Sequence, residues 1–273
     1  MTTCRIIKPP LACIPARMTV LSRKQREIAD RHNQFLAIAR QLLHEEGFHQ
    51  LSMDRVAELA EYSKGTLYQH FNCKEEMLGQ ICISAMQRLF ELGQRALNYS
   101  GSHRERLLAF FIAHDLFQKL EPNDVSVMHN FHSDQVLEKL TDITKQRHLE
   151  LQQSIFNSVK SLVEDAMTAG DLPRSNASSG DIVFGLWSLT HGAESLRTNN
   201  LPLQELGVAD SGVAVVGMLS KLLDGLGWQP LSQNQMSDLE HISRIQNELF
   251  KDEIEAVRSW TEKHQQITHR DTQ

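Results

Sequence analysis

Apolar residues recur every three or four positions along almost the whole chain, and this period decides the fold class. No run of alternating polarity is long enough to indicate a strand, and the sequence contains no evident internal repeat. The sequence therefore predicts an all-α protein. The first helix ends at the stop signal of Gly47, and its apolar face is formed by Phe35, Ile38, Ala39, Leu42 and Leu43.

Two short helices follow closely on the first one. Ser52 is the expected N-cap of the second, and Ser63 is the expected N-cap of the third, which is predicted to run from Lys64 to Phe71. Two short helices separated by a turn of about three residues have the geometry of a helix-turn-helix. The pattern thus predicts an N-terminal three-helix domain of this kind at residues 27–78.

Charge is distributed unevenly, although the formal net charge of the 273 residues is only −6. Residues 1–26 contain six basic side chains and no acidic one, which leaves the remainder strongly acidic. A basic arm before an acidic globule is typical of proteins that touch phosphate backbones, and a solvated tail is the alternative. We expect residues 1–26 to form a disordered arm, unless translation begins at Met18.

The residue pattern argues against several function classes. No apolar run approaches the roughly 18 residues of a membrane span, so no membrane partner is expected. The four cysteines form no C-x-x-C pair, so they indicate neither a zinc site nor a disulfide framework, which fits a reducing cytoplasm. We also expect no metal and no cofactor. We interpret the motif from His129 through His132 to Asp134 as an exposed helix edge rather than a metal site. No spacing indicates a catalytic nucleophile.

The polar side chains of the third predicted helix suit contact with DNA. Gly65 lets a backbone approach closely, the amide of Gln69 can pair with adenine, and Lys64 can reach guanine or a phosphate. The alternative is an unrelated helical bundle whose polar face is merely solvated. Further donors toward phosphate oxygens are Thr66, Tyr68, His70 and Lys74.

Residues 63–71, SKGTLYQHF, followed by residues 74–78, KEEML, resemble the recognition helix and the next helix start of the TetR/AcrR family of bacterial transcription regulators. The resemblance covers about residues 30–80 and implies a DNA-binding role for this segment. It also implies that Ser52 both caps a helix and binds phosphate. The complete set of expected DNA-binding residues is Ser52, Ser63, Lys64, Gly65, Thr66, Tyr68, Gln69, His70 and Lys74.

Two positions depart from the family pattern. Glu61 stands where the family has a glycine in a left-handed turn, which costs on the order of 1 kcal/mol. Cys73 replaces the usual capping serine, so its thiol or Asn72 must cap the following helix. A redox switch at Cys73 is an alternative to this passive role.

Residues 79–229 are expected to form a helical ligand-binding and dimerisation domain, with helices near 75–98, 104–119, 135–169, 181–198 and 211–226. Its aromatic and polar residues suit a mostly apolar effector cavity, although many such residues are ordinary core. Phe110 and Met167 are further residues that could line this cavity. The expected lining residues are Phe111, His114, Phe117, Met128, Phe131, Phe156, Phe184, Trp187 and His191.

The helix at 181–198 combines an apolar stripe with a stripe of small residues, so it can approach another helix closely. Together with the helix at 211–226 it resembles the pair that builds the family's dimeric four-helix bundle. A buried helix within one chain is the alternative. The expected interface residues are Ile182, Gly185, Leu186, Leu189, Gly192, Leu196, Val216, Leu219 and Leu223.

Residues 230–273 are interpreted as a polar linker and one long extra helix within 235–264, whose apolar stripe includes Ile242, Ile245 and Leu249. That stripe needs a partner, either the ligand domain or a second subunit. We favour the second subunit.

The resemblance implies a homodimeric regulator that binds a palindromic double-stranded DNA operator, most often as a repressor, and has no enzymatic activity. A small-molecule effector, largely apolar, is expected to lower the DNA affinity. The alternatives are an activator or a ligand-independent regulator of the same fold, or an all-α enzyme or scaffold with a vestigial helix-turn-helix.

Overall fold

The computed structural model describes residues 22–259 except 48–49, 132–133, 175–176, 199–200 and 233–237, and all its regular structure within that part of the chain is helical. This confirms the all-α prediction. No helix of the described residues is long and apolar enough to cross a membrane. The helices are α1 (Arg23–Glu46), α2 (Met53–Leu59), α3 (Lys64–Tyr68), α4 (Lys74–Leu97), α5 (His103–Leu120), α6 (Pro122–Asn130), α7 (Asp134–Leu137), α8 (Asp142–Ala169), α9 (Ser179–Thr198), α10 (Ser211–Gly225) and α11 (Asp238–Leu249).

The first helix begins earlier than the apolar pattern indicated. Ser22 caps α1, because its hydroxyl accepts the backbone N–H of Gln25 while the Gln25 side chain accepts the N–H of Ser22. The segment expected to be a disordered arm, residues 1–26, is therefore helical from Arg23 onward. Residues 1–21 lie outside the described part of the chain.

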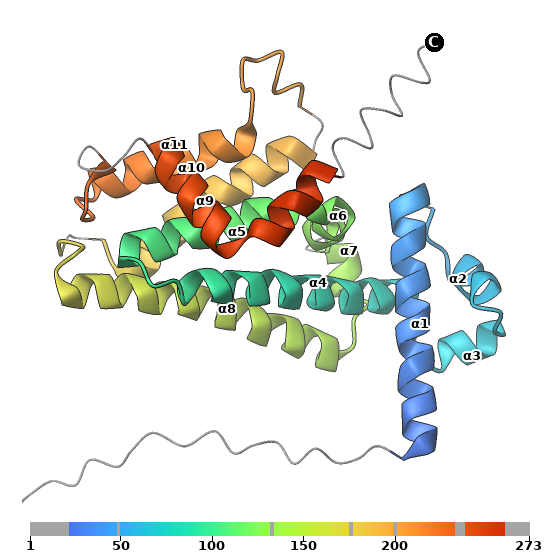
Figure 1. The fold of residues 1–273 in the computed structure, drawn as a ribbon. Helices are drawn as coiled ribbons and strands as arrows, with labels where there is room; N and C mark the ends of the chain where they lie inside the picture. The colour runs from blue at the N-terminus through green and yellow to red at the C-terminus, as the bar shows by residue number, and fades with distance from the viewer. Residues whose placement is uncertain are drawn as a thin grey trace, which may run out of the picture.

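The helix-turn-helix domain stands at one end of an elongated helical body (Figure 1). Helix α1 runs crosswise to the start of α4 in that view, with α2 and α3 on its outer side. Phe35, Val56 and Leu67 from these three helices are fully buried and pack together in one core. Burying three such side chains contributes about 5 kcal/mol or more, which offsets the low intrinsic stability of helices this short.

The domain boundary expected after residue 78 falls inside α4, which is one continuous helix. The core beneath α1–α3 also includes Val127 and Phe131, which lie at α6. The helix-turn-helix domain therefore shares its core with the body. Helices α4 and α6 thus contact it directly, with no linker between them.

The helix expected over 135–169 is two helices. The chain breaks between α7 and α8, where the hydroxyl of Thr141 accepts the backbone N–H of Thr144 and starts a new helix. The sequence analysis also missed α6, which begins with Pro122 at its first position. These breaks turn α6 and α7 across the end of the body beside the helix-turn-helix domain (Figure 1).

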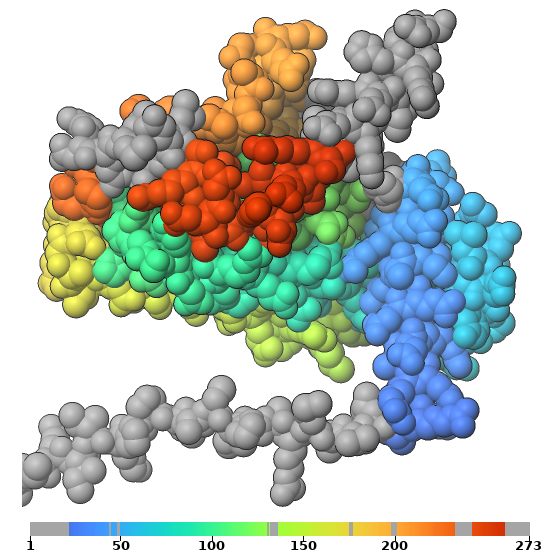
Figure 2. Space-filling view, viewed as in Figure 1, coloured from blue at the N-terminus to red at the C-terminus, as the bar shows by residue number. Residues whose placement is uncertain are grey.

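The C-terminal region packs on its own chain, which corrects the interpretation that it extends a dimer interface. Figure 2 shows α11 and residues 251–259 lying over α4 and α5. Ile242, Ile245 and Phe250 are buried in the core of the body. The single helix expected over 235–264 is broken at Phe250, whose ring is fully buried at the break. Polar contacts fasten the segment, including one of 2.6 Å from Tyr99 Oη to Glu248.

Candidate nucleic-acid interface and candidate ligand cavity

The turn between α2 and α3 has the geometry expected from its sequence. Glu61 has a φ of 59°, in the left-handed region that favours glycine, as predicted. Tyr62 then packs the edge of its ring against Phe35, with ring centroids 5.5 Å apart, and Arg31 lies 5.0 Å over the Tyr62 ring. These contacts hold the turn although it carries a residue with a Cβ at the strained position.

Two serines start the short helices, as expected from their positions. The Ser52 hydroxyl accepts the N–H of Arg55 at 3.3 Å, and the Ser63 hydroxyl accepts the N–H of Thr66 at 3.1 Å. The hydroxyls of Ser63 and Thr66 also share a hydrogen bond of 2.9 Å. Each cap therefore fixes the start of its own short helix.

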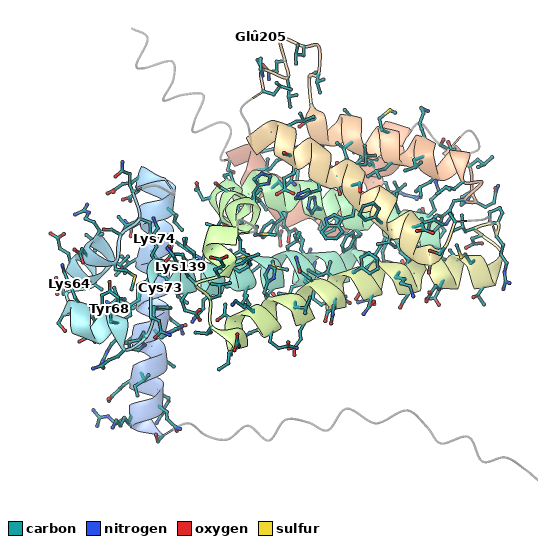
Figure 3. All side chains as sticks on the ribbon, turned by 180° about the vertical axis from the view of Figure 1, so that it is seen from behind. Lys64, Tyr68, Cys73, Lys74, Lys139 and Glu205 are labelled. Atoms are coloured by element: carbon teal, nitrogen blue, oxygen red, sulfur yellow. The ribbon has the colours of Figure 1, made fainter. Side chains whose placement is uncertain are left out.

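The outer face of α3 carries the ammonium group of Lys64, the glycine Gly65, which has no side chain, and the phenol of Tyr68. Lys64 and Tyr68 point away from the body in Figure 3, and Tyr68 is 49% exposed. The ammonium of Lys64 lies 2.7 Å from the carboxylate of Asp54 on α2, and this contact raises the pKa of Lys64. A Cβ added at Gly65 would meet only the Ser63 hydroxyl, at an ordinary 3.8 Å. The fold itself does not require a glycine there.

The remaining expected DNA-binding residues lie at the end of this face. Helix α3 is shorter than predicted and ends at Tyr68, so the exposed Gln69 is its C-cap. His70 is half-buried against the rings of His32 and Phe35, at centroid distances of 5.6 and 5.3 Å. Burial lowers the pKa of His70, so its imidazole is neutral at pH 7 and offers one N–H. Lys74 is the first residue of α4, and burial lowers its pKa.

A cluster of polar contacts joins the start of α4 to the segment before α8, beside Cys73 and Lys139 in Figure 3. The Cys73 thiol caps α4 by accepting the N–H of Glu76 at 3.4 Å, which is one of the two caps expected. The buried Glu76 carboxylate accepts the backbone N–H of Thr141 at 2.9 Å and its hydroxyl at 3.1 Å. The hydroxyl of Thr144 also donates to Glu76. These bonds attach the helix-turn-helix domain to the body.

A cavity of about 150 Å³ lies inside the body between α4, α5, α6, α8 and α9. Most of its wall is apolar and aromatic, as expected for an effector site. Burial raises the pKa of the Cys82 thiol in this wall to about 12, so that thiol is unreactive at neutral pH. The lining residues are Cys82, Met86, Leu89, Phe90, Phe110, Phe111, His114, Met128, His129, Gln152, Ile155, Phe156, Val159, Val183, Trp187, Thr190, His191 and Glu194.

The structure brings together six of the nine expected lining residues: Phe111, His114, Met128, Phe156, Trp187 and His191. The other three are corrected. Phe117 and Phe131 are buried in other parts of the core, and Phe184 is 65% exposed on the outer face of α9. An aromatic residue on a predicted helix does not by itself indicate which neighbour it faces, because helices bury residues on several sides.

Sequence analysis missed Glu194, which forms the polar end of the cavity. Its carboxylate lies 3.7 Å from His191 Nδ1 and 4.0 Å from His114 Nε2. Burial raises the pKa of Glu194, while burial, Arg197 and His191 lower the pKa of His114 to about 4. A glutamate three residues after His191, on a helix with few charges, was the available signal.

Helix α6 links the cavity to the helix-turn-helix domain. Met128 and His129 line the cavity, and Asp124 lies one turn earlier on the same helix. The carboxylate of Asp124 is buried, contacts Arg88 of α4 and lies 3.7 Å from Arg40 of α1. A ligand that displaces α6 would therefore move a charged contact on α1.

The expected dimer interface is corrected at five of its nine residues. Ile182, Leu186, Val216, Leu219 and Leu223 are buried in the core of their own chain. Gly185, Leu189, Gly192 and Leu196 are exposed, together with further apolar residues of α9 and α10. We call this surface the α9–α10 face, and define it as Phe184, Gly185, Gly192, Leu196, Val213, Gly217, Met218 and Leu222.

A family model described as bacterial regulatory proteins, tetR family, matches residues 35–81, the segment that includes α2, α3 and part of α1. The transcriptional activator FasR of Mycolicibacterium smegmatis is 33% identical over 92 residues, which are 32% of this chain and 42% of that protein. The match thus spans less than half of this relative. The uncharacterized regulator YhgD of Bacillus subtilis is 25% identical over 141 residues, 52% of this chain and 71% of that protein.

Among solved structures, the fold is similar to that of the TetR family regulator PfmR from Thermus thermophilus, with a TM-score of 0.55. The similarity covers 70% of this chain and 98% of that chain at 20% identity, so it extends the common fold well beyond the helix-turn-helix.

Proposed function

We propose that this chain, whose residues 35–81 match the tetR family model, is a TetR-family transcriptional regulator and not an enzyme, and that it binds a palindromic double-stranded operator as a homodimer and acts as a repressor. A small, largely apolar molecule that fills the cavity would lower the DNA affinity. Two copies of α3, about 34–36 Å apart, would enter successive turns of the major groove.

The observation that carries the proposal is Gly65. Nothing in the chain's own packing requires a glycine at this exposed helical position, where glycine is less stable than alanine by about 1 kcal/mol. A bare backbone between Lys64 and Thr66 is useful where a phosphate or a base edge approaches closely. Lys64 and Tyr68, on the same short helix, supply the charge and the hydroxyl that such a ligand needs.

The dimer is supported by the α9–α10 face. Phe184 is 65% exposed and Met218 is 59% exposed, and large apolar side chains gathered on one surface favour burial against a partner. Gly185, Gly192 and Gly217 on this face have open space where a Cβ would stand. Helices of a second subunit can therefore approach the two helices closely.

Effector control is supported by the position of α6, which contributes Met128 to the cavity and Asp124 to the contact with Arg40 of α1. A ligand that shifts α6 would change the separation of the two recognition helices and hence the operator affinity. The relative FasR is named an activator, so activation is the second candidate.

The proposal is tested with DNA from upstream of the protein's own coding region, by fluorescence anisotropy at several salt concentrations. We expect Lys64→Ala to weaken binding by about tenfold and to reduce the salt slope by about one. Tyr68→Phe should weaken it less. Lys145→Ala, the same substitution at an exposed lysine of α8, is the control and should bind like the wild type. Equal, salt-insensitive binding by all four proteins would contradict the proposed phosphate contacts.

A further inference from the structure

The polar end of the cavity is a carboxylate among imidazoles. The Glu194 carboxylate lies 3.7 Å from His191 on its own helix and 4.0 Å from His114 on α5. The ring of His129, on α6, stacks on that of His191 with centroids 5.9 Å apart. Three helices thus converge on Glu194, which is only 8% exposed.

The acidic group at this end is Glu194; burial raises its pKa, whereas the charges of His129 and Arg197 favour its ionised form. Glu194 is the only Asp, Glu, Lys or Arg among the described residues that line the cavity. His114 is neutral at pH 7, because burial and the nearby Arg197 lower its pKa to about 4. Arg197 itself is bound by Asp115 at 3.0 Å and Ser211 at 3.3 Å. Arg197 does not line the cavity, so a ligand carboxylate there would lie beside the Glu194 carboxylate and not beside a guanidinium.

The walls favour a cation as well. Phe90, Phe110, Phe111, Phe156 and Trp187 all line the cavity. The faces of aromatic rings are electronegative and attract organic cations, most strongly where water is excluded. The volume of about 150 Å³ is similar to that of an apolar cavity that takes benzene, so the apolar part of the ligand is limited to about six or seven carbon atoms.

We propose that the cavity selects a small organic cation, an alkyl- or arylammonium, with its ammonium group at Glu194 and its apolar part between the aromatic rings. The corresponding carboxylate is excluded by charge. This inference rests on the proposed function, because it names the class of effector that would occupy the same cavity.

Isothermal titration calorimetry on the full-length protein at pH 7.5 compares the affinities of three ligands: heptylammonium, 1-heptanol and heptanoate. Each has a linear alkyl chain, and they differ in the charge of the head group. We expect heptylammonium to bind about tenfold more tightly than 1-heptanol, and heptanoate to bind most weakly. Glu194→Gln, which keeps the shape of the side chain, should remove the advantage of the cation and leave 1-heptanol unchanged. Glu150→Gln, at an exposed position of α8, is the matched control.

The ranking of the three ligands by the wild-type protein is sufficient by itself, so the test does not depend on the stability of the Glu194 variant. The inference would be overturned if heptanoate bound as tightly as heptylammonium or if all three ligands bound equally. It would also be overturned if none of the three bound. Operator binding is measured separately without ligand. A protein that binds the operator but not the cation refutes only this inference, whereas one that binds the cation but not the operator refutes only the proposed function.

Discussion

The ammonium of Lys64, on the helix that we place at DNA, lies 2.7 Å from the carboxylate of Asp54 on α2. Both side chains are about two-thirds exposed, so the pair sits on the surface that would face the phosphate backbone. Asp54 orients Lys64 in this structure and would compete with the phosphates of bound DNA for it.

Replacing Asp54 by Asn should therefore strengthen operator binding. The change frees Lys64 and removes a negative charge that faces the backbone, which is expected to raise affinity roughly threefold to tenfold. Anisotropy at low and high salt measures the effect, which should shrink as salt rises. Asp165→Asn on α8 controls for net charge. Unchanged or weaker binding by Asp54→Asn would place Lys64 away from the phosphates.

Gly65→Ala should separate stability from DNA binding. The added methyl group meets no close neighbour, so thermal stability should stay the same or rise, by about 1 kcal/mol at most. Operator affinity should fall by about tenfold or more, because the methyl group blocks close approach. Gly180→Ala is the matched control, since a Cβ at Gly180 also meets only a serine hydroxyl, at 3.7 Å. If Gly65→Ala retains full affinity, Gly65 does not face the DNA backbone.

Glu61→Gly should stabilise the helix-turn-helix domain. Glu61 has a φ of 59°, where a residue with a Cβ is strained by about 1 kcal/mol relative to glycine. Denaturant unfolding should show a gain of that order. Glu58→Gly, inside α2, should instead lose about 1 kcal/mol. A loss of stability in both variants would show that the turn is not under strain.

Met218→Asp should abolish the proposed dimer. Its side chain is 59% exposed on the α9–α10 face, and a buried carboxylate in a close helix contact is costly. Sedimentation velocity should show the mass of a monomer for this variant and of a dimer for the wild type. Ile143→Asp, at an 81% exposed apolar side chain of α8, should remain a dimer. A dimer in both variants would move the interface elsewhere.

Stability should fall in acid because of His114. Burial, Arg197 and His191 lower its pKa from 6.5 to about 4, although Asp115 opposes the shift. Below about pH 6.5 the unfolded chain takes up a proton that the folded protein refuses, so stability is lost as the pH falls toward 4. Between about pH 6.5 and pH 5 the wild type should lose up to ~2 kcal/mol more than His114→Gln. Parallel curves for the two proteins would mean that His114 is solvated.

Much of the helix-turn-helix could be predicted because its signals are local. Ser52 and Ser63 lie within three residues of the N–H groups that they cap, and Glu61 has a left-handed backbone because the turn requires it. The cavity was predicted only in part. His114 and Trp187 were identified from residue type, whereas Glu194 was missed, because it meets His114 only through the packing of α9 on α5, which are far apart in the sequence.

The sequence by itself determined the helical class and the capped short helices, because periodicity and caps act over one or two turns of chain. Only the tertiary structure decided which face of each helix is covered. Ile182 and Leu219 point into their own core, whereas Phe184 and Met218 point outward. Phe250 fills the core at a helix break. An apolar stripe predicts that something covers it, but the covering partner is set by contacts between distant segments, which periodicity does not encode.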